Sequence, residues 1–249
     1  SRQFELPELK LLVDSIQSSK FITARKSNEL IRKLESLCSE YEAKKLQRQV
    51  YVSGRIKTMN ESIYYNVDSI HNAITENKKI MFQYFQWNLK KEMELRHNGE
   101  MYHISPWGLS WNDENYYLVG YDSEDQMIKH YRVDKMLKIR MSDEPREGKK
   151  YFEKFDIGTY SRKNFSMFGG KEERVRLLMD NQMAGVVIDR FGKDISMVPV
   201  DDNHFSISVD VVVSQQFFGW VFALGKGVKI IGPESVVQQV NQEIKRLVE

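Results

Sequence analysis

The sequence of 249 residues contains a single cysteine, Cys38. One cysteine excludes an internal disulfide and any metal site built from several thiolates. The chain also lacks an apolar run of about 20 residues, the length that a membrane-spanning helix requires, and no signal peptide precedes Phe4. We therefore expect a cytoplasmic protein with no membrane partner. Because Cys38 falls on an apolar helical stripe, we expect a buried core thiol rather than a nucleophile.

The net charge of the chain is also small. The chain has 37 basic and 35 acidic residues, and a net charge of +2 is too small to coat nucleic acid by electrostatics alone. The balance varies along the chain: residues 1–60 have 12 Lys/Arg and 7 Asp/Glu, whereas residues 61–145 have 10 and 14. An anion site in the middle must therefore be a local cluster. For the basic front we prefer a solvated helix surface to direct contact with nucleic acid.

The sequence motifs of common enzymes are missing as well. The chain has no G-x-S-x-G, H-E-x-x-H, Walker A or G-x-G-x-x-G motif. Its five histidines include no pair at the spacing of metal ligands. We therefore predict no catalytic residues, no metal and no cofactor, and we do not expect an enzyme.

Apolar residues at helical spacing predict three helices near the N-terminus. Pro7 stands where the first turn of a helix tolerates proline, and we predict Ser27 as the N-cap of the second helix. The three apolar stripes are Leu9, Leu12, Val13 and Ile16; Leu30, Leu34, Leu37, Cys38 and Tyr41; and Ile63, Val67, Ile70 and Ile74.

The region of residues 79–140 changes to the alternation of β-strands. In "IMFQYFQ", Ile80, Phe82 and Tyr84 alternate with Met81, Gln83 and Phe85. The stretches "HNGE", "WNDEN" and "DSEDQ" read as turns between further strands. About five short antiparallel strands are too few for a large sandwich, so we predict a small, strongly bent barrel.

The remaining sequence predicts a second domain. "SDEPREGKK" and "SRKN" read as a linker. Beyond it the predicted elements follow the order βαββαβ plus a terminal helix, which is the ferredoxin-like plan, with helices closed by Gly192 and Gly225. The predicted fold class is α+β. Its parts are a helical segment at 1–60, the small barrel with a preceding helix at 61–145, a linker at 146–172 and a ferredoxin-like domain at 173–249.

One predicted hairpin, "ENYYLVGYDSEDQMIKHYRVDKM" at residues 114–136, concentrates unusual chemistry. It contains four tyrosines, a histidine and several cations. On a strand, His130, Arg132 and Asp134 would share a face. A cation in mid-strand needs a partner or solvent. Asp134 is the plain partner for Arg132; the alternative is an anionic ligand whose bases stack on the aromatic rings.

The segment "ISPWGLSWNDENYYLVGYD…KHYRVDKM" resembles the WYL domain of bacterial transcription regulators. Tyr116, Tyr117 and Leu118 stand where that family has Trp–Tyr–Leu. Tyr116 replaces the tryptophan, and Lys135 replaces a second arginine. The lysine ammonium cannot form the two parallel hydrogen bonds that an arginine guanidinium offers to an anion. The helical front is similar to the family's linker, and residues from about 173 to 249 are similar to its C-terminal extension. Since the chain begins with Ser1 inside a helix-like pattern, we expect a fragment that lacks the N-terminal winged helix-turn-helix.

The resemblance implies an Sm-like, SH3-like barrel that senses a ligand within a homodimer. The implied effector is a nucleic acid or a nucleotide, and the missing head would bind promoter DNA. Arg132 matches the family's basic position and Lys135 is a weaker second. The other candidate ligand-binding residues are chosen by the strand face on which they lie and by their side-chain chemistry. They are Tyr84, His130, and the hydroxyl donors Ser105 and Tyr117, of which Tyr117 could equally be a core residue. The alternatives are a dimerisation scaffold without ligand and an enzyme acting on nucleotides. The identity of the effector and the sign of regulation stay open.

Overall fold

The computed structural model describes residues 4–46, 57–153, 163, 165 and 170–249 of the chain. The chain divides into two compact units, Ser1–Lys154 and Phe155–Glu249. Both units combine helices with an antiparallel sheet, which confirms the α+β class.

The first unit begins with helices at the places that the apolar stripes indicate. They are α1 (Leu6–Ser18), α2 (Ala24–Glu35), α3 (Glu40–Lys45) and α4 (Ile63–Thr75). Pro7 lies in the first turn of α1, as predicted. The N-cap of α2 is Thr23, not Ser27: Thr23 has extended backbone angles, and its Oγ1 accepts the N–H of Lys26 at 3.1 Å. Ser27 lies inside the helix, where its buried hydroxyl accepts a hydrogen bond from Lys57.

The prediction for Cys38 was wrong. Helix α2 ends at Glu35, and Cys38 lies half-buried in the connection to α3. The chain cannot continue as one helix here because Ser39 and Glu42 form a capping box that starts α3. The second half of the predicted stripe is therefore not a helix face, and Tyr41 is 69% exposed.

The sheet of the first unit has six strands. They are β1 (Lys78–Trp87), β2 (Met93–Leu95), β3 (Tyr102–Asn112), β4 (Asn115–Asp122), β5 (Met127–Arg132) and β6 (Met136–Pro145). The strand order is β2-β1-β3-β4-β5, and β6 pairs with β1. The sequence predicts one strand fewer, because β2 has only three exposed residues, too few to give a recognisable period-2 signal.

The turns of this sheet use left-handed backbone angles. In "HNGE", His97, Asn98 and Gly99 have φ values of 49°, 52° and 85°. Between β3 and β4, Asp113 and Glu114 have φ values of 46° and 60° and form a two-residue hairpin loop. The three predicted turns are confirmed.

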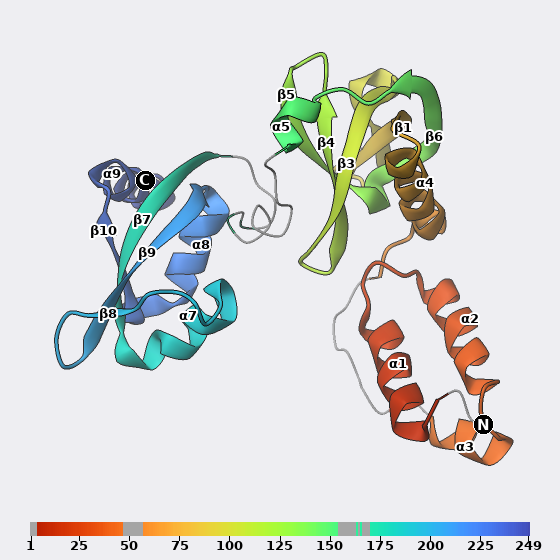
Figure 1. Cartoon of the computed structure of the whole chain (residues 1–249), viewed down its shortest axis with the longest axis horizontal. Coiled ribbons are helices and arrows are strands. Elements are labelled where there is room, and N and C mark those ends of the chain that lie inside the picture. Colours follow the sequence, from red (N-terminus) through yellow and green to blue (C-terminus); the bar gives the residue numbers. More distant parts are fainter. Residues whose placement is uncertain (1–3, 47–56, 154–162, 164, 166–169) are drawn as a thin grey trace. The chain divides into compact units, whose positions relative to one another are not determined.

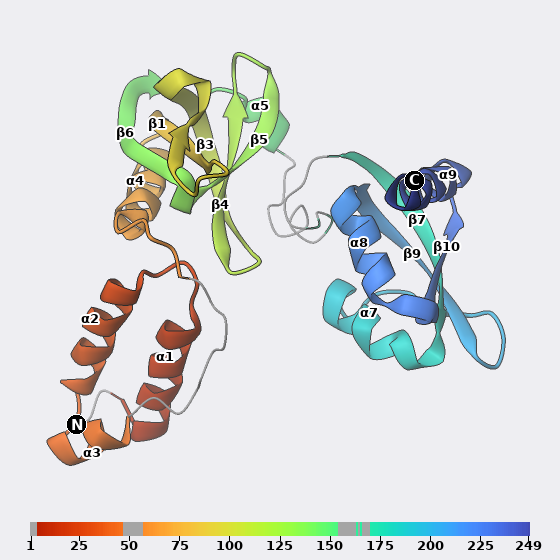
Figure 2. The same cartoon turned by 180° about the vertical axis from the view of Figure 1, so that it is seen from behind.

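The core of the first unit lies between α4 and the concave face of the sheet (Figures 1 and 2). The predicted alternation in β1 holds, since Ile80, Phe82 and Tyr84 are all buried in this core. The Phe82 ring lies 5.3 Å from Tyr131 in an edge-on contact. From the helix, Ile70 is fully buried against the same cluster. Burying a side chain of this size contributes about 1.5–3 kcal/mol.

A short helix, α5 (Lys149–Phe152), packs on the outside of the curled sheet. Phe152 stacks on Trp107 at 4.9 Å, and Tyr151 stacks on Tyr121 at 5.1 Å. Gly148 precedes the helix with φ of 81°, and a Cβ at this position would lie 2.3 Å from the ring of Tyr121. Glycine is therefore required where the chain leaves the sheet.

The second unit has the element order that the sequence predicts. Its elements are β7 (Lys171–Asp180), α7 (Ala184–Phe191), β8 (Val198–Pro199), β9 (His204–Val213), α8 (Gln215–Ala223), β10 (Val228–Gly232) and α9 (Glu234–Val248). The antiparallel sheet has the order β10-β7-β9-β8. Gly192 and Gly225 follow the predicted helices with φ of 90° and 63°. Only β8, with two residues, is much shorter than expected.

Asn66 on α4 should be essential to the stability of the first unit. Its buried Nδ2 donates to the carbonyls of Val133 at 3.3 Å and Met136 at 3.0 Å. Asn66→Ala should lower the free energy of unfolding by about 1–3 kcal/mol, because a buried carbonyl loses its donor. Chemical denaturation followed by tryptophan fluorescence measures this, in a Trp220→Phe background where the remaining tryptophans all lie in the first unit.

The matched control is Asn72→Ala on the same helix. Asn72 is exposed, and its amide contacts the Asp68 carboxylate at 3.2 Å. This change should stay within about 0.5 kcal/mol of the wild type. Equal effects at the two positions would show that the hydrogen bonds of Asn66 do not hold the sheet to the helix.

Candidate functional site

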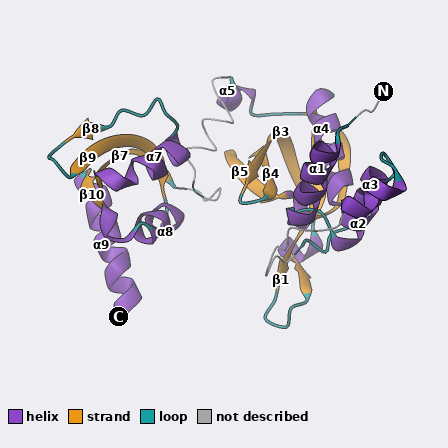
Figure 3. Cartoon of the chain, turned by 90° about the horizontal axis from the view of Figure 1, so that it is seen from below, coloured by secondary structure: helices purple, strands orange, loops and turns teal. Residues whose placement is uncertain are grey.

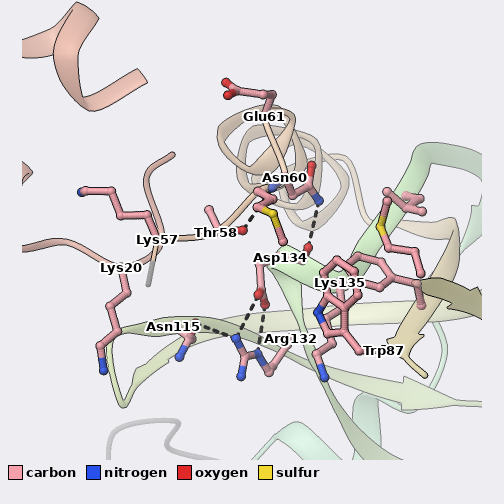
Figure 4. Close-up of a pocket in the computed structure, with 14 residues that line it drawn as sticks. Lys20, Lys57, Thr58, Asn60, Glu61, Trp87, Asn115, Arg132, Asp134 and Lys135 are labelled. Carbon is pink, nitrogen blue, oxygen red and sulfur yellow. Dashed lines mark hydrogen bonds and ion pairs between the residues drawn. The ribbon is translucent and has the colours of Figure 1, made fainter. Parts of the chain in front are cut away.

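A cavity of about 620 Å³ lies in the first unit beside the end of β5 (Figure 4). Its wall comes from the α1–α2 turn, the segment before α4, the β1–β2 hairpin, the start of β4 and the turn after β5. The lining residues are Lys20, Lys57, Thr58, Met59, Asn60, Glu61, Phe85, Trp87, Met93, Asn115, Arg132, Asp134, Lys135 and Leu137. The cavity thus combines four cations with an apolar surface and two carboxylates.

The turn Val133–Lys135 places the basic residues of this cavity. It is a single 3₁₀ turn between β5 and β6. Asn66 holds it through the Val133 carbonyl, and Asn60 donates to the carbonyls of Asp134 at 2.9 Å and Met136 at 3.1 Å. The carbonyls of Val133, Asp134 and Met136 therefore each accept a side-chain hydrogen bond, as buried backbone groups require.

Arg132 is the last residue of β5 and not a mid-strand residue. Its backbone N–H donates to the hydroxyl of Tyr84 at 3.0 Å. Its Nε and Nη2 donate to the two carboxylate oxygens of Asp134 at 3.0 and 2.9 Å, and Nη2 also donates to Asn115 Oδ1 at 3.0 Å (Figure 4). Burial by itself would lower the pKa of Arg132, but the fork with Asp134 raises it above its ordinary value.

The guanidinium retains unused donors. Within the described ranges of the chain, Nη1 of Arg132 makes no hydrogen bond. Asp134 does not lie on a strand face shared with Arg132, as the hairpin pattern suggested. The 3₁₀ turn folds it back instead, so the ion pair uses Nε and Nη2 and leaves Nη1 to donate to a ligand.

Lys135 follows at once and is half-buried. Among the residues that the structure describes, its ammonium makes no hydrogen bond or ion pair. Burial lowers its pKa, and the positive charges of Arg132 and Arg96 lower it further, while Asp134 opposes them. The cavity therefore has a cation whose charge is not neutralised by a direct partner.

The other two cations of the cavity are engaged by the protein. Lys20 forms an ion pair with Glu114 at 3.0 Å. Lys57 donates to the carbonyls of Ile16 at 3.2 Å and Ser19 at 2.6 Å, at the C-terminal end of α1, where a positive charge also complements the helix dipole. Both lysines join the helical segment to its surroundings, and neither is among the predicted site residues, because only the tertiary fold brings them near Arg132.

The remaining predicted residues do not line the cavity. Tyr84 is 8% exposed, and burial raises its pKa to about 12. Tyr117 pairs with Arg132 across β4 and β5, and burial raises its pKa also. His130 pairs with Val119, and burial lowers its pKa to about 4.

Ser105 lies elsewhere in the sheet. It is fully buried, and its Oγ accepts the N–H of Glu147 at 2.9 Å. Of the six predicted residues, the structure therefore brings Arg132 and Lys135 to the cavity, with Tyr84 directly beneath Arg132. An aromatic and apolar wall formed by Phe85, Trp87 and Met93 was not predicted.

Two further properties bear on the site. Among the described residues, no group of three or more His, Cys, Asp or Glu side chains is arranged to hold a metal ion. In the same part of the chain, no helix has both the length and the apolar character needed to cross a bilayer.

Comparison with known families identifies both units. The WYL domain family matches residues 65–141, which include the curled sheet and the turn that places Arg132. The WCX domain family matches residues 171–248, which form the second unit's sheet and helices. The chain is thus a WYL-domain protein in which a WCX domain follows the WYL domain. This confirms the resemblance seen in the sequence.

Solved structures show distant similarity. Proteasome accessory factor B/C (PafBC) of Arthrobacter aurescens is 18% identical, with 97% of this chain and 36% of that chain covered and a TM-score of 0.33. A CRISPR Cas-related protein is 13% identical, with 98% and 72% covered and a TM-score of 0.44. The chain therefore spans about a third of the length of the PafBC chain. No curated protein matches the sequence.

His130 should couple the stability of the first unit to pH. Its folded pKa of about 4 lies below the ordinary value of 6.5. Between pH 6.5 and 4 the imidazole of His130 is protonated in the unfolded chain but neutral in the folded protein. The contribution of the neutral ring to the free energy of unfolding is therefore fully present above pH 6.5 and decreases as the pH falls toward 4. The free energy of unfolding of the wild type, relative to His130→Gln, should fall by up to about 3 kcal/mol over this range.

The same tryptophan-monitored denaturation measures this difference at several pH values. Above pH 6.5 the difference between the two proteins should be constant, because the ring is neutral in both states. A difference that also stays constant down to pH 4 would contradict the assignment of a buried neutral imidazole.

Proposed function

We propose that this chain is the effector-sensing and dimerisation part of a bacterial transcription regulator, and that the cavity beside Arg132 binds an anionic effector of nucleotide or nucleic-acid type. The observation that carries the proposal is the pair formed by Lys135, which lacks a direct partner among the described residues, and Arg132, whose Nη1 is free of hydrogen bonds in the same part of the chain. Both side chains line one cavity.

The energetics of this pair favour an anion. Two adjacent cations repel each other, and partial burial adds a desolvation penalty to each charge. The lowered pKa of Lys135 expresses this penalty. A phosphate or carboxylate would relieve the repulsion and accept hydrogen bonds from both groups. Cations with shifted pKa values in a cavity are typical of functional sites. They destabilise the free protein, and the binding of an anion offsets that cost.

The family supports the regulatory part of the proposal. The resemblance implies a sensor whose state reaches a winged helix-turn-helix that binds promoter DNA, within a homodimer in the cytoplasm. The cavity is lined both by the curled sheet and by the helical segment, through Lys20 and residues 57–61. An effector that contacts both parts can bind one arrangement of them more tightly than another, which is what a change of conformation requires.

We propose that the effector is bound and not chemically changed, so a nucleotide incubated with the protein should stay intact.

The same inference extends to the fold types. We infer that the curled sheet is an Sm-like, SH3-like barrel, since a short turn joins its two end strands. We infer that the second unit is ferredoxin-like, and the sheet order β10-β7-β9-β8 supports this.

A scaffold without ligand is the second candidate, and one observation favours it. The ion pair of Arg132 with Asp134 is bidentate, and the Asp134 side chain is only 13% exposed. This arrangement by itself stabilises the turn without any effector. It gives no role to Lys135, which is why the sensor is the preferred proposal.

Lys135→Met separates the two functions more cleanly than a change at Arg132. Short labelled single-stranded DNA and RNA oligomers should bind the wild type, with affinity that falls as salt rises. Lys135→Met should weaken this binding and lower the salt dependence by the equivalent of about one phosphate contact. Stability should be unchanged or slightly higher, because the removed charge is disfavoured in the folded state. Fluorescence anisotropy at two salt concentrations provides the measurement.

Two variants complete the design. Lys10→Met removes an exposed lysine on α1 outside the cavity and should bind as the wild type does. Arg132→Ala should abolish binding and also lower stability by about 1–3 kcal/mol, because Asp134 loses its partner. If the wild type binds no oligomer, or if binding survives in both Lys135→Met and Arg132→Ala, the cavity is not a site for nucleic acid.

A further inference from the structure

The β1–β2 hairpin supplies a feature of the cavity that the cations do not explain. Strand β1 pairs with β3 as far as Phe82 and with β6 as far as Tyr84. Beyond these residues, 85–87 pair with 93–95 of β2. The hairpin therefore projects from the curled sheet as a two-stranded ribbon (Figure 3).

The ribbon has one apolar face. Phe85 and Trp87 alternate with Gln86, and Trp87 stands directly across from Met93, while Gln86 stands across from Glu94. Trp87 is 45% exposed and Met93 is 59% exposed. An isolated two-stranded ribbon is marginally stable in water, so an exposed apolar face on it indicates a surface kept for contact with something else.

Trp87 is held in a position that suits stacking. The Phe85 ring meets it edge-on, with centroids 5.6 Å apart and an interplanar angle of 86°. Phe85 itself is buried at 6% exposure and so provides a fixed support. A supported indole loses little side-chain freedom when a flat ligand stacks on its exposed surface.

Trp87 and Met93 line the same cavity as Arg132 and Lys135. We infer that Trp87 is a specificity-determining residue that stacks on a base of the effector while the two cations take its phosphate, so that the cavity selects aromatic anions over plain phosphate esters. This inference rests on the proposed function. The occupant follows from charge complementarity, because Asp134 already pairs with Arg132 and an apolar partner alone would leave Lys135 without an anion.

Three tyrosines near the site, Tyr84, Tyr116 and Tyr131, pack against other rings of the protein. Tyr84 and Tyr131 are 8% and 6% exposed, and their rings pack edge-on against each other at 5.5 Å in the core. Tyr116 lies against Phe21 at 5.1 Å and Trp111 at 4.8 Å. Trp87 is the half-exposed aromatic ring among the described residues that line the cavity.

A matched pair of oligomers isolates the stacking from the phosphate contacts. One is a labelled thymidine oligomer of about six nucleotides, a length usual for a small single-strand site; the other is its abasic analogue with the same number of phosphates. Fluorescence anisotropy with the intact chain should show the base-containing oligomer binding about 5- to 150-fold more tightly, the range of one stacked base. Trp87→Ala should reduce this ratio to about one, and Trp87→Tyr should restore part of it.

Two controls separate the outcomes. Leu89→Ala changes a fully exposed residue at the tip of the same ribbon and should leave the ratio unchanged. Lys135→Met should weaken both oligomers equally and also leave the ratio unchanged. A ratio that Trp87→Ala does not alter overturns the inference about Trp87 and leaves the anion site standing. A Trp87→Ala protein that loses self-association instead, by sedimentation, assigns the ribbon to a second copy of the chain. Absence of binding to either oligomer overturns the nucleic-acid form of the proposed function, and with it the base contact of Trp87.

Discussion

The three-residue turn Val133–Lys135 is the constraint on which the first unit depends. Strands β5 and β6 lie at opposite edges of the sheet, and three residues can join them only if the sheet curls strongly enough to bring the end of β5 near the start of β6. The turn then has buried carbonyls that face the core, and Asn60 and Asn66 supply their donors. The curl of the sheet, the position of α4 and the placement of the basic residues therefore all depend on this turn.

This turn has an electrostatic consequence. The turn that joins β5 to β6 places Arg132, Asp134 and Lys135 along the edge of the cavity, and the ion pair of Asp134 is with Arg132. The charge of Lys135 is disfavoured by burial and by Arg132, and Asp134 offsets this only in part. A stable fold with one uncompensated cation in a cavity is what an anion-binding protein requires before its ligand arrives. The apolar ribbon with Trp87 adds a surface on which a flat base can stack beside these charges.

The sequence predicted the local elements of the fold well and the lining of the site only in part. Local patterns predicted the alternation of Ile80, Phe82 and Tyr84 and the glycine-closed helices of the second unit, because these depend on periodicity and backbone angles. The failures were also local: Ser27 competed with Thr23 as a helix cap, and the exposed strand β2 has only three residues, too few for a periodic signal. Arg132 was singled out as a cation among strand residues and by the resemblance to the WYL family, and Lys135 by that resemblance alone. Lys20 and Trp87 were not, since nothing in their own surroundings in the sequence indicates that they reach the same cavity.

The central claim is that Lys135 carries a positive charge that awaits an anion, and the titration of its own ammonium tests this most directly. The chain can be labelled at its lysine side chains for NMR, with Lys135→Arg to assign the signal. The pKa of Lys135 should lie below the ordinary value of 10.5 in the free protein, and it should rise when a single-stranded oligomer is added. A signal with an ordinary pKa that no oligomer shifts would contradict the account, because the charge would then be solvated and would have no ligand to meet.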